Sequence, residues 1–379
     1  MPRISIWEKE TIFAPQDVVI IGCGFVGLWS AFYLKKKFPE KKITILERGI
    51  VPSGASTRNA GFACFGSLSE LIRDGATMGA DKMLSIVEMR YKGLQKIQKY
   101  FSKKDIDFEL CGGYELYENN KISAEELRHN IGYLNSLLIP ITGIKKTFKM
   151  ADEKISQFGL GQTEHLVENQ LEGFQHSGKL LQSLLRKVIS MGVQVITSAD
   201  VKEFTRREAI IEVATENFTI TTRKLLLATN AFTGQLIEGM DIVPARGQVL
   251  VTSVINNLTI KGTFHSDEGY YYFRNLGDRI LLGGARNKAF EEEQTLEIDI
   301  SHTIQSELER YLEDVVLPNY KGQYEIEYRW AGIMCMGSEK TPIIKELEEN
   351  VYCAIRMSGI GVAIAPIVAQ QVSKIMFKA

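Results

Sequence analysis

The chain of 379 residues is 45% hydrophobic and longer than one core usually fills, so we expect two domains. Its 45 lysine and arginine residues nearly balance 46 aspartate and glutamate residues, and the net charge of -1 gives no electrostatic reason to expect nucleic acid as a partner. The longest apolar stretch, residues 360–367, is far shorter than the ~20 residues of a membrane span, and the N-terminal residues lack the layout of a signal peptide, so neither a membrane span nor export is expected.

The predicted elements begin with a β-α-β unit. Residues 17–22 form a short apolar run that ends in glycine, which is typical of a strand buried on both faces in a parallel sheet. Apolar residues at helical spacing follow directly, Pro39 ends that helix, and residues 43–46 form a second apolar run.

Later segments alternate between helical and strand patterns. A long charged helix is predicted over residues 81–104, and a second helix over residues 180–189 ends at Gly192. Strands are predicted at residues 193–196, 210–215, 218–222, 225–229, 248–254, 270–274 and 280–283. One helix follows Ser301, and a glycine turn at residues 358–361 leads into a last helix over residues 362–376.

This order predicts an α/β fold with an α+β second domain, in which a Rossmann-like cofactor-binding domain is interleaved with an antiparallel-sheet substrate domain. The cofactor-binding domain takes three segments, residues 1–80, 172–243 and 331–379. The substrate domain takes the two others, residues 81–171 and 244–330.

A GxGxxG pattern, formed by Gly22, Gly24 and Gly27, joins the first strand to its helix, and Glu47 ends the next strand. Gly22 permits a tight turn, Gly24 lets the backbone approach a pyrophosphate, and Gly27 allows helix and strand to pack closely. Glu47 is placed to bind ribose hydroxyls, and its charge would repel the 2′-phosphate of NADP. The pattern therefore predicts NAD or FAD as the cofactor.

The loop at residues 52–61, PSGASTRNAG, is rich in small residues, hydroxyls and backbone donors. Such a composition suits a segment that lies against a large planar ring and its phosphates, which favours flavin. An ordinary linker is the alternative interpretation, because glycine and serine are also typical of linkers.

Six motifs in order along nearly the whole chain resemble those of the D-amino-acid oxidase, glycine oxidase and sarcosine oxidase family of flavoproteins. They are the GxGxxG strand with Glu47-Arg48, the loop at residues 54–61, PARGQ at 244–248, residues 271–286, RWAGIM at 329–334, and SGIGVAIAP at 358–366. The resemblance implies a protein that binds FAD and oxidises amines.

The resemblance also implies which residues bind FAD. Glu47 and Arg48 would hold the adenosine, Val201 would contact adenine through its backbone, and Ala228 and Thr229 would complete the nucleotide side. The other positions lie in the first glycine turn, in the loop beside the isoalloxazine ring, at Met334 and in the C-terminal glycine turn: Gly22, Gly24, Phe25, Val26, Gly27, Gly54, Ala55, Ser56, Thr57, Arg58, Asn59, Ala60, Gly61, Met334, Met357, Ser358, Gly359, Ile360, Gly361 and Val362. Asn230 stands where the family usually has glycine, so a different turn is expected there.

By the same resemblance, a small amine or amino acid gives hydride to flavin N5, and the imine is hydrolysed in water. Arg58, Tyr271 and Arg286 fall near positions that line the pocket of sarcosine oxidase. Each has an alternative role, because Arg58 could bind a phosphate or backbone, Tyr271 could be one of three packed tyrosines, and Arg286 could be solvated. Solvent or a neighbouring group can take the proton of the ammonium, so no strong side-chain base is required.

Three side chains of the family are missing from this chain. The lysine that speeds the reaction with O2 aligns with Leu282, the carboxylate-binding lysine of sarcosine oxidase with Ala363, and the carboxylate-binding arginine of glycine oxidase with Met334. A free amino-acid carboxylate has therefore lost two familiar partners, and the electron acceptor is either O2 or another molecule.

The five cysteines are scattered and lack metal-ligand spacing, which predicts reduced thiols in a cytoplasmic protein and no metal site: Cys23, Cys64, Cys111, Cys335 and Cys353. Cys335 lies near the region where sarcosine oxidase carries FAD on a cysteine, but the register does not match. We therefore expect Cys335 to be a buried thiol and FAD to be bound non-covalently.

Three hypotheses follow. The first is oxidation of the C–N bond of a small amine or amino acid by an FAD-dependent oxidase or dehydrogenase. The second is a dehydrogenase or tailoring enzyme for a larger amine-bearing molecule, of which modified tRNA is disfavoured by the lack of basic surplus. The third is a flavin-binding protein without turnover, which the missing lysine and arginine partners leave open.

Overall fold

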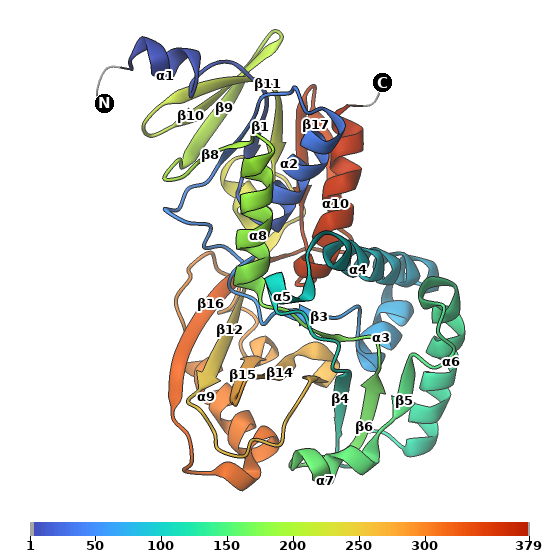
Figure 1. The fold of residues 1–379 in the computed structure, drawn as a ribbon. Helices are drawn as coiled ribbons and strands as arrows, with labels where there is room; N and C mark the ends of the chain where they lie inside the picture. Colours follow the sequence, from blue (N-terminus) through green and yellow to red (C-terminus); the bar gives the residue numbers. More distant parts are fainter. Residues whose placement is uncertain (1–3, 378–379) are drawn as a thin grey trace. The chain divides into compact units, whose positions relative to one another are not determined.

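The computed structural model describes residues 4–377, which divide into two units (Figure 1). Unit 1 contains the residues up to Thr57, Ser177–Pro244 and the residues from Met334 onward. Unit 2 contains Arg58–His176 and Ala245–Ile333. The two units are thus interleaved along the chain.

The first boundary lies earlier in the structure than in the sequence-based prediction, which places it at residue 80. Residues 58–80 carry β3 (Phe62–Ala63) and α3 (Leu68–Met78), and both pack within unit 2. Residues 1–3 and 378–379, which the predicted domains include, lie outside the described residues.

Unit 1 is built on an eight-stranded sheet in which β1 (Gln16–Ile21) lies between β11 (Thr219–Leu227) and β2 (Ile43–Leu46), parallel to both. The order is β17-β18-β11-β1-β2-β8, and β10 and β9 continue from β11 in antiparallel pairing. The strands not yet bounded are β8 (Gln194–Ile196), β9 (Val201–Arg207), β10 (Ile210–Thr215), β17 (Ile343–Glu348) and β18 (Val351–Ile355). All four residues of β2 are buried, as its continuous apolar run predicts.

Two helices of unit 1 pack against each other beside this sheet (Figure 1). They are α2 (Phe25–Lys37), which follows β1 almost directly, and α10 (Gly361–Met376). Trp29 and Leu28 of α2 are fully buried, so this helix is covered on several sides. The other helical segments of unit 1 are α1 (Ile6–Glu10), α8 (Ser177–Ser190) and the 3-10 turn η2 (Asn230–Gln235).

Unit 2 is built on a second eight-stranded sheet, ordered β16-β12-β15-β14-β13-β4-β6-β5. Its neighbours run antiparallel from β12 to β13 and from β4 to β5, whereas β13 and β4 are parallel. The strands are β4 (Gly113–Glu118), β5 (Phe148–Met150), β6 (Thr163–Asn169), β12 (Val243–Thr252), β13 (Thr263–Ser266), β14 (Tyr271–Leu276), β15 (Arg279–Gly284) and β16 (Ile326–Met336). A two-stranded sheet pairs β3 with β7 (Gly173–Phe174).

The helical segments of unit 2 come from both parts of its chain. They are α3, α4 (Ala80–Tyr100), α5 (Lys103–Ile106), α6 (Ala124–Thr142), η1 (Asp152–Lys154), α7 (Ile155–Phe158), η3 (Asp267–Gly269), η4 (Arg286–Lys288), α9 (His302–Tyr311), the π-helical turn η5 (Leu312–Val316) and η6 (Pro318–Tyr320). Within residues 4–377, no helix has the length and apolar character that a membrane crossing requires.

The two faces of the unit 2 sheet differ, because successive side chains of a strand point to opposite faces. On β14, Tyr271 and Phe273 belong to the main hydrophobic core, which also contains residues of α9. Tyr272 lies on the other face, in a smaller cluster with Phe62 and Trp330. We call the face that carries Tyr272 the aromatic face.

Candidate functional site

The glycine turn after β1 is shaped by three close approaches, all within unit 1. Gly22 has a φ of 106°, and a Cβ atom there would lie 2.8 Å from the carbonyl oxygen of Ala228. A Cβ atom at Gly27 would overlap the Gly22 carbonyl oxygen, and one at Gly24 would lie 2.9 Å from the hydroxyl of Ser56. The backbone at this turn thus has no room for side chains, which is the property that the sequence pattern assigns to a pyrophosphate-binding turn.

Glu47 reaches this turn from the end of β2. Its Oε2 accepts a hydrogen bond from the N–H of Cys23 at 3.1 Å, and its Oε1 accepts one from Gly49 at 3.0 Å. Burial, followed by the charge of Glu47, raises the pKa of the Cys23 thiol to about 12, so this thiol stays protonated. A carboxylate held at the turn offers acceptor oxygens to which ribose hydroxyls could donate.

The N-terminus of α2 is joined to the loop at residues 54–57. The N–H of Phe25 donates to the Ser56 hydroxyl at 2.9 Å, while Gly24 at the N-cap position offers no side chain. The loop therefore lies at the positive end of a helix dipole, where phosphate groups are favoured. Thr57 closes the loop on itself by donating to the Pro52 carbonyl at 3.2 Å.

The C-terminal glycine turn precedes α10 and has a strained backbone. Ser358 and Gly359 have φ values of 46° and 79°, and the N–H of Ser358 donates to the Cys335 carbonyl at 3.0 Å. The Ser358 hydroxyl is buried without a hydrogen-bond partner among the described residues. Since a buried hydroxyl without a partner is costly, this orphan group fits a site that a polar ligand completes. Met334 borders the turn, with its sulfur 3.4 Å from where a Cβ of Gly359 would lie.

Asn230 accommodates the position that is usually glycine. Its φ of 51° is in the left-handed region, which asparagine tolerates better than most residues. Its side-chain oxygen accepts a hydrogen bond from the N–H of Met357 at 3.2 Å. Asn230 thus adds a side-chain contact to the C-terminal turn, and its backbone lies in the left-handed region that favours glycine.

The remaining predicted nucleotide contacts lie around the ends of the parallel strands of unit 1. Ala228 follows β11 and donates from its N–H to the Ile21 carbonyl at 2.9 Å, and Thr229 is the N-cap residue of η2. Arg48 stacks over the ring of Phe232 at 3.7 Å, and Val201 begins β9. These residues lie where nucleotides bind in doubly wound sheets, beyond the carboxyl ends of the strands or close to them.

The family described as FAD dependent oxidoreductase, DAO, matches residues 17–375. The chain belongs to the DAO family. It is 24% identical to the "Probable oxidoreductase OrdL" of Haemophilus influenzae over 374 residues, which cover 94% of this chain and 82% of that protein. The corresponding Rhizobium meliloti protein is 23% identical and covers 92% of this chain and 80% of its own length.

Solved structures share the DAO fold over nearly the whole chain. The L-proline dehydrogenase of P. horikoshii has a TM-score of 0.77 at 21% identity and covers 96% of this chain and 94% of its own. The glycine oxidase of Bacillus cereus has a TM-score of 0.74 at 19% identity, and the match covers 95% of this chain and 94% of the glycine oxidase chain. The protein is therefore an FAD-dependent oxidoreductase with the two-part fold predicted from the sequence.

The other part of the predicted flavin loop, residues 58–61, is held within unit 2. Arg58 donates from Nη1 to the Ala331 carbonyl at 2.9 Å, and the Trp330 indole donates to the Arg58 carbonyl at 3.1 Å. The buried guanidinium of Arg274 donates to the Ala60 carbonyl at 2.7 Å. Arg58 is thus bonded to the backbone, which was one of its alternative roles, and Arg274 is a positioning residue that the sequence did not single out.

Two further loop residues form a turn that presents the backbone. The N–H of Gly61 donates to the side-chain oxygen of Asn59 at 2.9 Å, and the Gly61 carbonyl accepts from the N–H of Gln175 at 2.7 Å. At the start of the loop, in unit 1, Gly54 is exposed and Ala55 is half-buried. A Cβ at Gly54 would meet no described atom within 4 Å.

The structure separates the neighbouring tyrosines of β14. Tyr271 is 4% exposed and stacks on Tyr311 with ring centroids 4.2 Å apart, inside the main core of unit 2. Tyr272 lies on the aromatic face, where Gly283 leaves room for its ring, since a Cβ there would lie 2.5 Å from a ring carbon of Tyr272. For the substrate role proposed from the sequence, this placement favours Tyr272 over Tyr271.

Arg286 follows β15 and stacks over the ring of Phe290 at 4.7 Å. Burial lowers the pKa of Arg286. Burial raises the pKa of Tyr272, and the charge of Arg286 opposes that rise, which indicates that the two side chains are close in the fold. Arg286 is therefore less solvated than a loop arginine usually is.

Two of the three family positions that differ, Leu282 and Ala363, carry buried side chains. Leu282 lies in the main core of unit 2, and Ala363 is buried in α10 of unit 1. Cys335 is fully buried, and burial raises the pKa of its thiol to about 11. A protonated, buried thiol is a poor nucleophile, which supports the prediction of non-covalent FAD.

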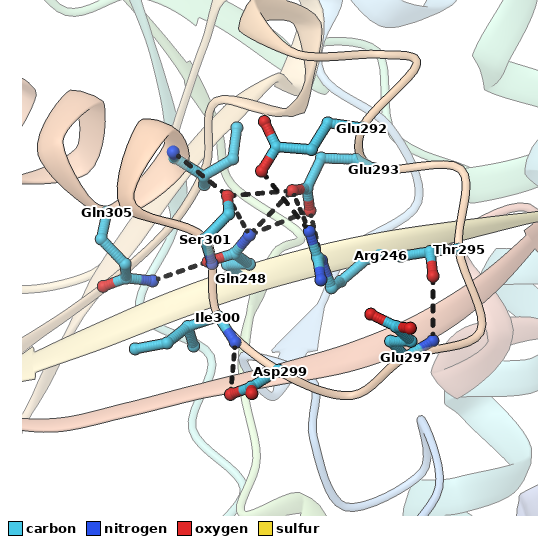
Figure 2. Close-up of polar contacts among 11 residues, drawn as sticks. Arg246, Gln248, Glu292, Glu293, Thr295, Glu297, Asp299, Ile300, Ser301 and Gln305 are labelled. Carbon is cyan, nitrogen blue, oxygen red and sulfur yellow. Dashed lines mark hydrogen bonds and ion pairs between the residues drawn. The ribbon is translucent and has the colours of Figure 1, made fainter.

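The PARGQ motif has a structural role that its resemblance alone did not reveal. Figure 2 shows Arg246 and Gln248 of β12 bonded to the buried carboxylate of Glu293. Arg246 makes two bonds, of 3.0 and 2.7 Å, and Gln248 donates to the same carboxylate at 2.9 Å. Ser301, the N-cap of α9, also donates to Glu293 at 3.1 Å (Figure 2). This network fixes the segment between η4 and α9 on the sheet.

Proposed function

We propose that this oxidoreductase oxidises the C–N bond of a small amine or amino acid. The observation that carries the proposal is the shared cluster of Ala60 and Tyr272. Ala60 belongs to the loop expected to flank the flavin ring, and Tyr272 belongs to the aromatic face of unit 2. A substrate held on this face therefore lies beside the flavin loop.

The FAD-binding residues proposed from the family fit the structure in unit 1. The glycine turn offers its backbone to the pyrophosphate, Glu47 offers its carboxylate to the ribose, and Ser358 has an unpartnered hydroxyl at the C-terminal turn. When bound, FAD accepts hydride from the carbon next to the substrate nitrogen. The substrate leaves as an imine, and water then converts the imine into a carbonyl compound and a free amine or ammonia.

The aromatic face orients the substrate and excludes water from it. Phe62 packs edge-on against Tyr272, with ring centroids 5.9 Å apart, and Trp330 belongs to the same cluster. The Tyr272 hydroxyl can accept from or donate to the amine, and Arg286 can bind a carboxylate. Apolar rings with few polar groups suit a small amine better than a highly charged substrate.

The solved relatives are described as acting on amino acids or related amines, namely proline, glycine and iminodiacetate. We extend this class of substrate to the present protein. The electron acceptor is O2 or another molecule, and the five free cysteines support a reducing, cytoplasmic location.

Anaerobic reduction of the bound flavin by a panel of amines tests the proposal. The holoprotein is mixed with primary, secondary and cyclic amino acids and with the corresponding amines that lack a carboxylate, and flavin bleaching is followed by absorbance. The proposal expects rapid bleaching by at least one small amine and reoxidation when O2 or an artificial acceptor is added. Bleaching by dithionite but by no small amine would contradict it and favour a larger substrate or a protein without turnover.

A further inference from the structure

We propose that Cys64, Glu172 and His265 of unit 2 bind a divalent transition-metal ion of the zinc class. Cys64 follows β3, Glu172 precedes β7, and His265 lies on β13. Each residue offers one ligand atom, and the three atoms all lie within 4.8 Å of one another. Because the three residues are far apart in the sequence, no ligand spacing indicated this site.

The distance between the imidazole and the carboxylate suits a shared ion. His265 Nε2 and Glu172 Oε2 are 3.6 Å apart, which is longer than an ordinary hydrogen bond. Two ligand atoms at about 2.05 Å from a tetrahedral zinc ion are separated by roughly 3.4 Å. The Nε2 atom of His265 is buried and has no hydrogen-bond partner among the described residues. A metal ion would supply that partner.

Surrounding groups hold the carboxylate in place. Glu172 is buried, and its Oε1 accepts hydrogen bonds from the N–H groups of Phe65 at 3.2 Å and Gly66 at 3.4 Å. Oε2 therefore remains directed at His265. A Cβ at Gly113 would overlap Oε2, so the glycine leaves space for it. Second-shell bonds of this kind orient ligands in metal sites.

The charges of the surrounding groups are compatible with a divalent ion. Arg90 is buried, lies 2.8 Å from Glu70, and donates to the sulfur of Cys64 at 3.4 Å. With Cys64 as thiolate, the two carboxylates and the thiolate exceed the single guanidinium by two negative charges. In the metal-bound state, in which Cys64 is a thiolate and His265 is neutral, a divalent ion balances these two charges.

The ligand types select the class of metal. A thiolate together with an imidazole suits zinc and neighbouring transition metals, whereas magnesium and calcium prefer oxygen ligands alone. Cys64 is only half-buried, so a water molecule can complete a four-coordinate site. The ion would join β13 to the segments that flank the two-stranded sheet.

Zinc binding to the intact holoprotein tests the site. The wild type is dialysed against chelator, equilibrated with zinc chloride and analysed by mass spectrometry of the metal. We expect about one tightly bound zinc ion per chain and, by X-ray absorption at the zinc edge, one sulfur ligand with nitrogen and oxygen ligands. Cys64→Ser and His265→Gln should each weaken zinc binding about 10- to 100-fold or more. Cys111→Ser, a half-buried cysteine of the same unit outside the cluster, is the control and should bind as the wild type does.

Two results would overturn the proposal. One is the absence of tight zinc binding to the wild type, which leaves His265 and Glu172 as a simple ion pair. The other is bound zinc without a sulfur ligand in the absorption spectrum, which places the ion elsewhere. The wild-type spectrum decides even if a variant folds poorly, and retained FAD reports the fold of each variant. Neither measurement depends on the identity of the amine.

Discussion

The carboxylate of Glu47 accepts a hydrogen bond from the backbone N–H of Cys23 at 3.1 Å. This contact joins the end of β2 to the glycine turn after β1, and the same carboxylate holds Gly49. Glu47 therefore positions the turn, and we propose that it also offers an acceptor to the ribose of FAD.

Glu47→Gln and Glu47→Ala should weaken FAD binding in that order. Glutamine keeps one acceptor oxygen, whereas alanine removes both, and a hydrogen bond to a charged group contributes about 1.5–3 kcal/mol. We expect Kd for FAD to rise roughly 10-fold for glutamine and roughly 100-fold for alanine, measured by flavin fluorescence on adding FAD to apoprotein. Glu40→Gln, an exposed residue before β2, is the control. Unchanged Kd in both Glu47 variants would remove Glu47 from the site.

Gly27→Ala should disrupt the cofactor site through packing. Its new methyl group overlaps the carbonyl oxygen of Gly22, so α2 must move away from β1. Overpacking of this kind costs about 1–3 kcal/mol, and we expect a lower thermal midpoint together with loss of most bound FAD. Gly132→Ala in α6, where a Cβ meets no described atom within 4 Å, should raise stability by about 0.5–1 kcal/mol. Equal effects of the two substitutions would contradict the close-packing role of Gly27.

Tyr272→Phe and Tyr271→Phe separate the two faces of β14. If Tyr272 contacts the substrate, losing its hydroxyl should lower kcat/KM roughly 3- to 10-fold, the loss expected for one hydrogen bond. Tyr271 stacks on Tyr311 in the core, so Tyr271→Phe should keep kcat/KM within about 2-fold. Steady-state kinetics with the best amine of the panel measures both. A larger loss for Tyr271 than for Tyr272 would reverse the assignment.

The two tyrosines show what a strand pattern cannot predict, namely which of two neighbouring aromatic residues faces the core. Alternation along a strand indicates two faces, but Tyr271 and Tyr272 are both aromatic, so the pattern did not indicate which one faces the core. The decision comes from tertiary packing, namely Tyr311 on one face and Gly283 on the other. A continuous apolar run gave a more accurate prediction. The strand predicted at residues 43–46 coincides with β2, in which every residue is buried and all but Thr44 are apolar.

Other elements escaped prediction because polar residues interrupt their patterns. The strands predicted at residues 218–222 and 225–229 are one strand, β11, in which the polar pair at 223–224 continues the ladder. Strand β4 was missed, since it buries Glu115, which accepts hydrogen bonds from serine and tyrosine hydroxyls and from the backbone N–H of Ser69. Arg274 was missed because a buried arginine without a carboxylate partner contradicts the usual exposure of arginine.

Tyr272 also gives a prediction about pH. Burial raises the pKa of Tyr272 in the folded protein to about 12, against 10.0 as its ordinary value. The folded state therefore holds this proton more tightly, and the resulting stability is fully present below pH 10 and is lost as pH rises through about 12.

Two measurements follow from this shift. The pH profile of kcat/KM should show no inflection from Tyr272 below about pH 10, and Tyr272→Phe should lower the profile without changing its shape there. From pH 10 upward, the thermal midpoint of the wild type should fall more steeply than that of Tyr272→Phe, while Tyr133→Phe, an exposed tyrosine, should follow the wild type. An inflection below pH 10 that Tyr272→Phe removes would contradict the raised pKa.

Asn230 offers a test that separates backbone conformation from side-chain contact. Asn230→Gly keeps the left-handed φ and loses only the bond to the N–H of Met357, whereas Asn230→Ala loses the bond and forces alanine into that conformation. We expect the alanine variant to be less stable than the glycine variant by about 1–2 kcal/mol, measured by thermal unfolding, and FAD binding to weaken in both. Asn257, which is exposed and has a φ of 57°, provides the control pair, because its glycine and alanine variants should differ by a similar amount with no change in FAD binding. Equal stability of the two Asn230 variants, alongside a difference at Asn257, would show that the left-handed backbone at residue 230 does not determine stability.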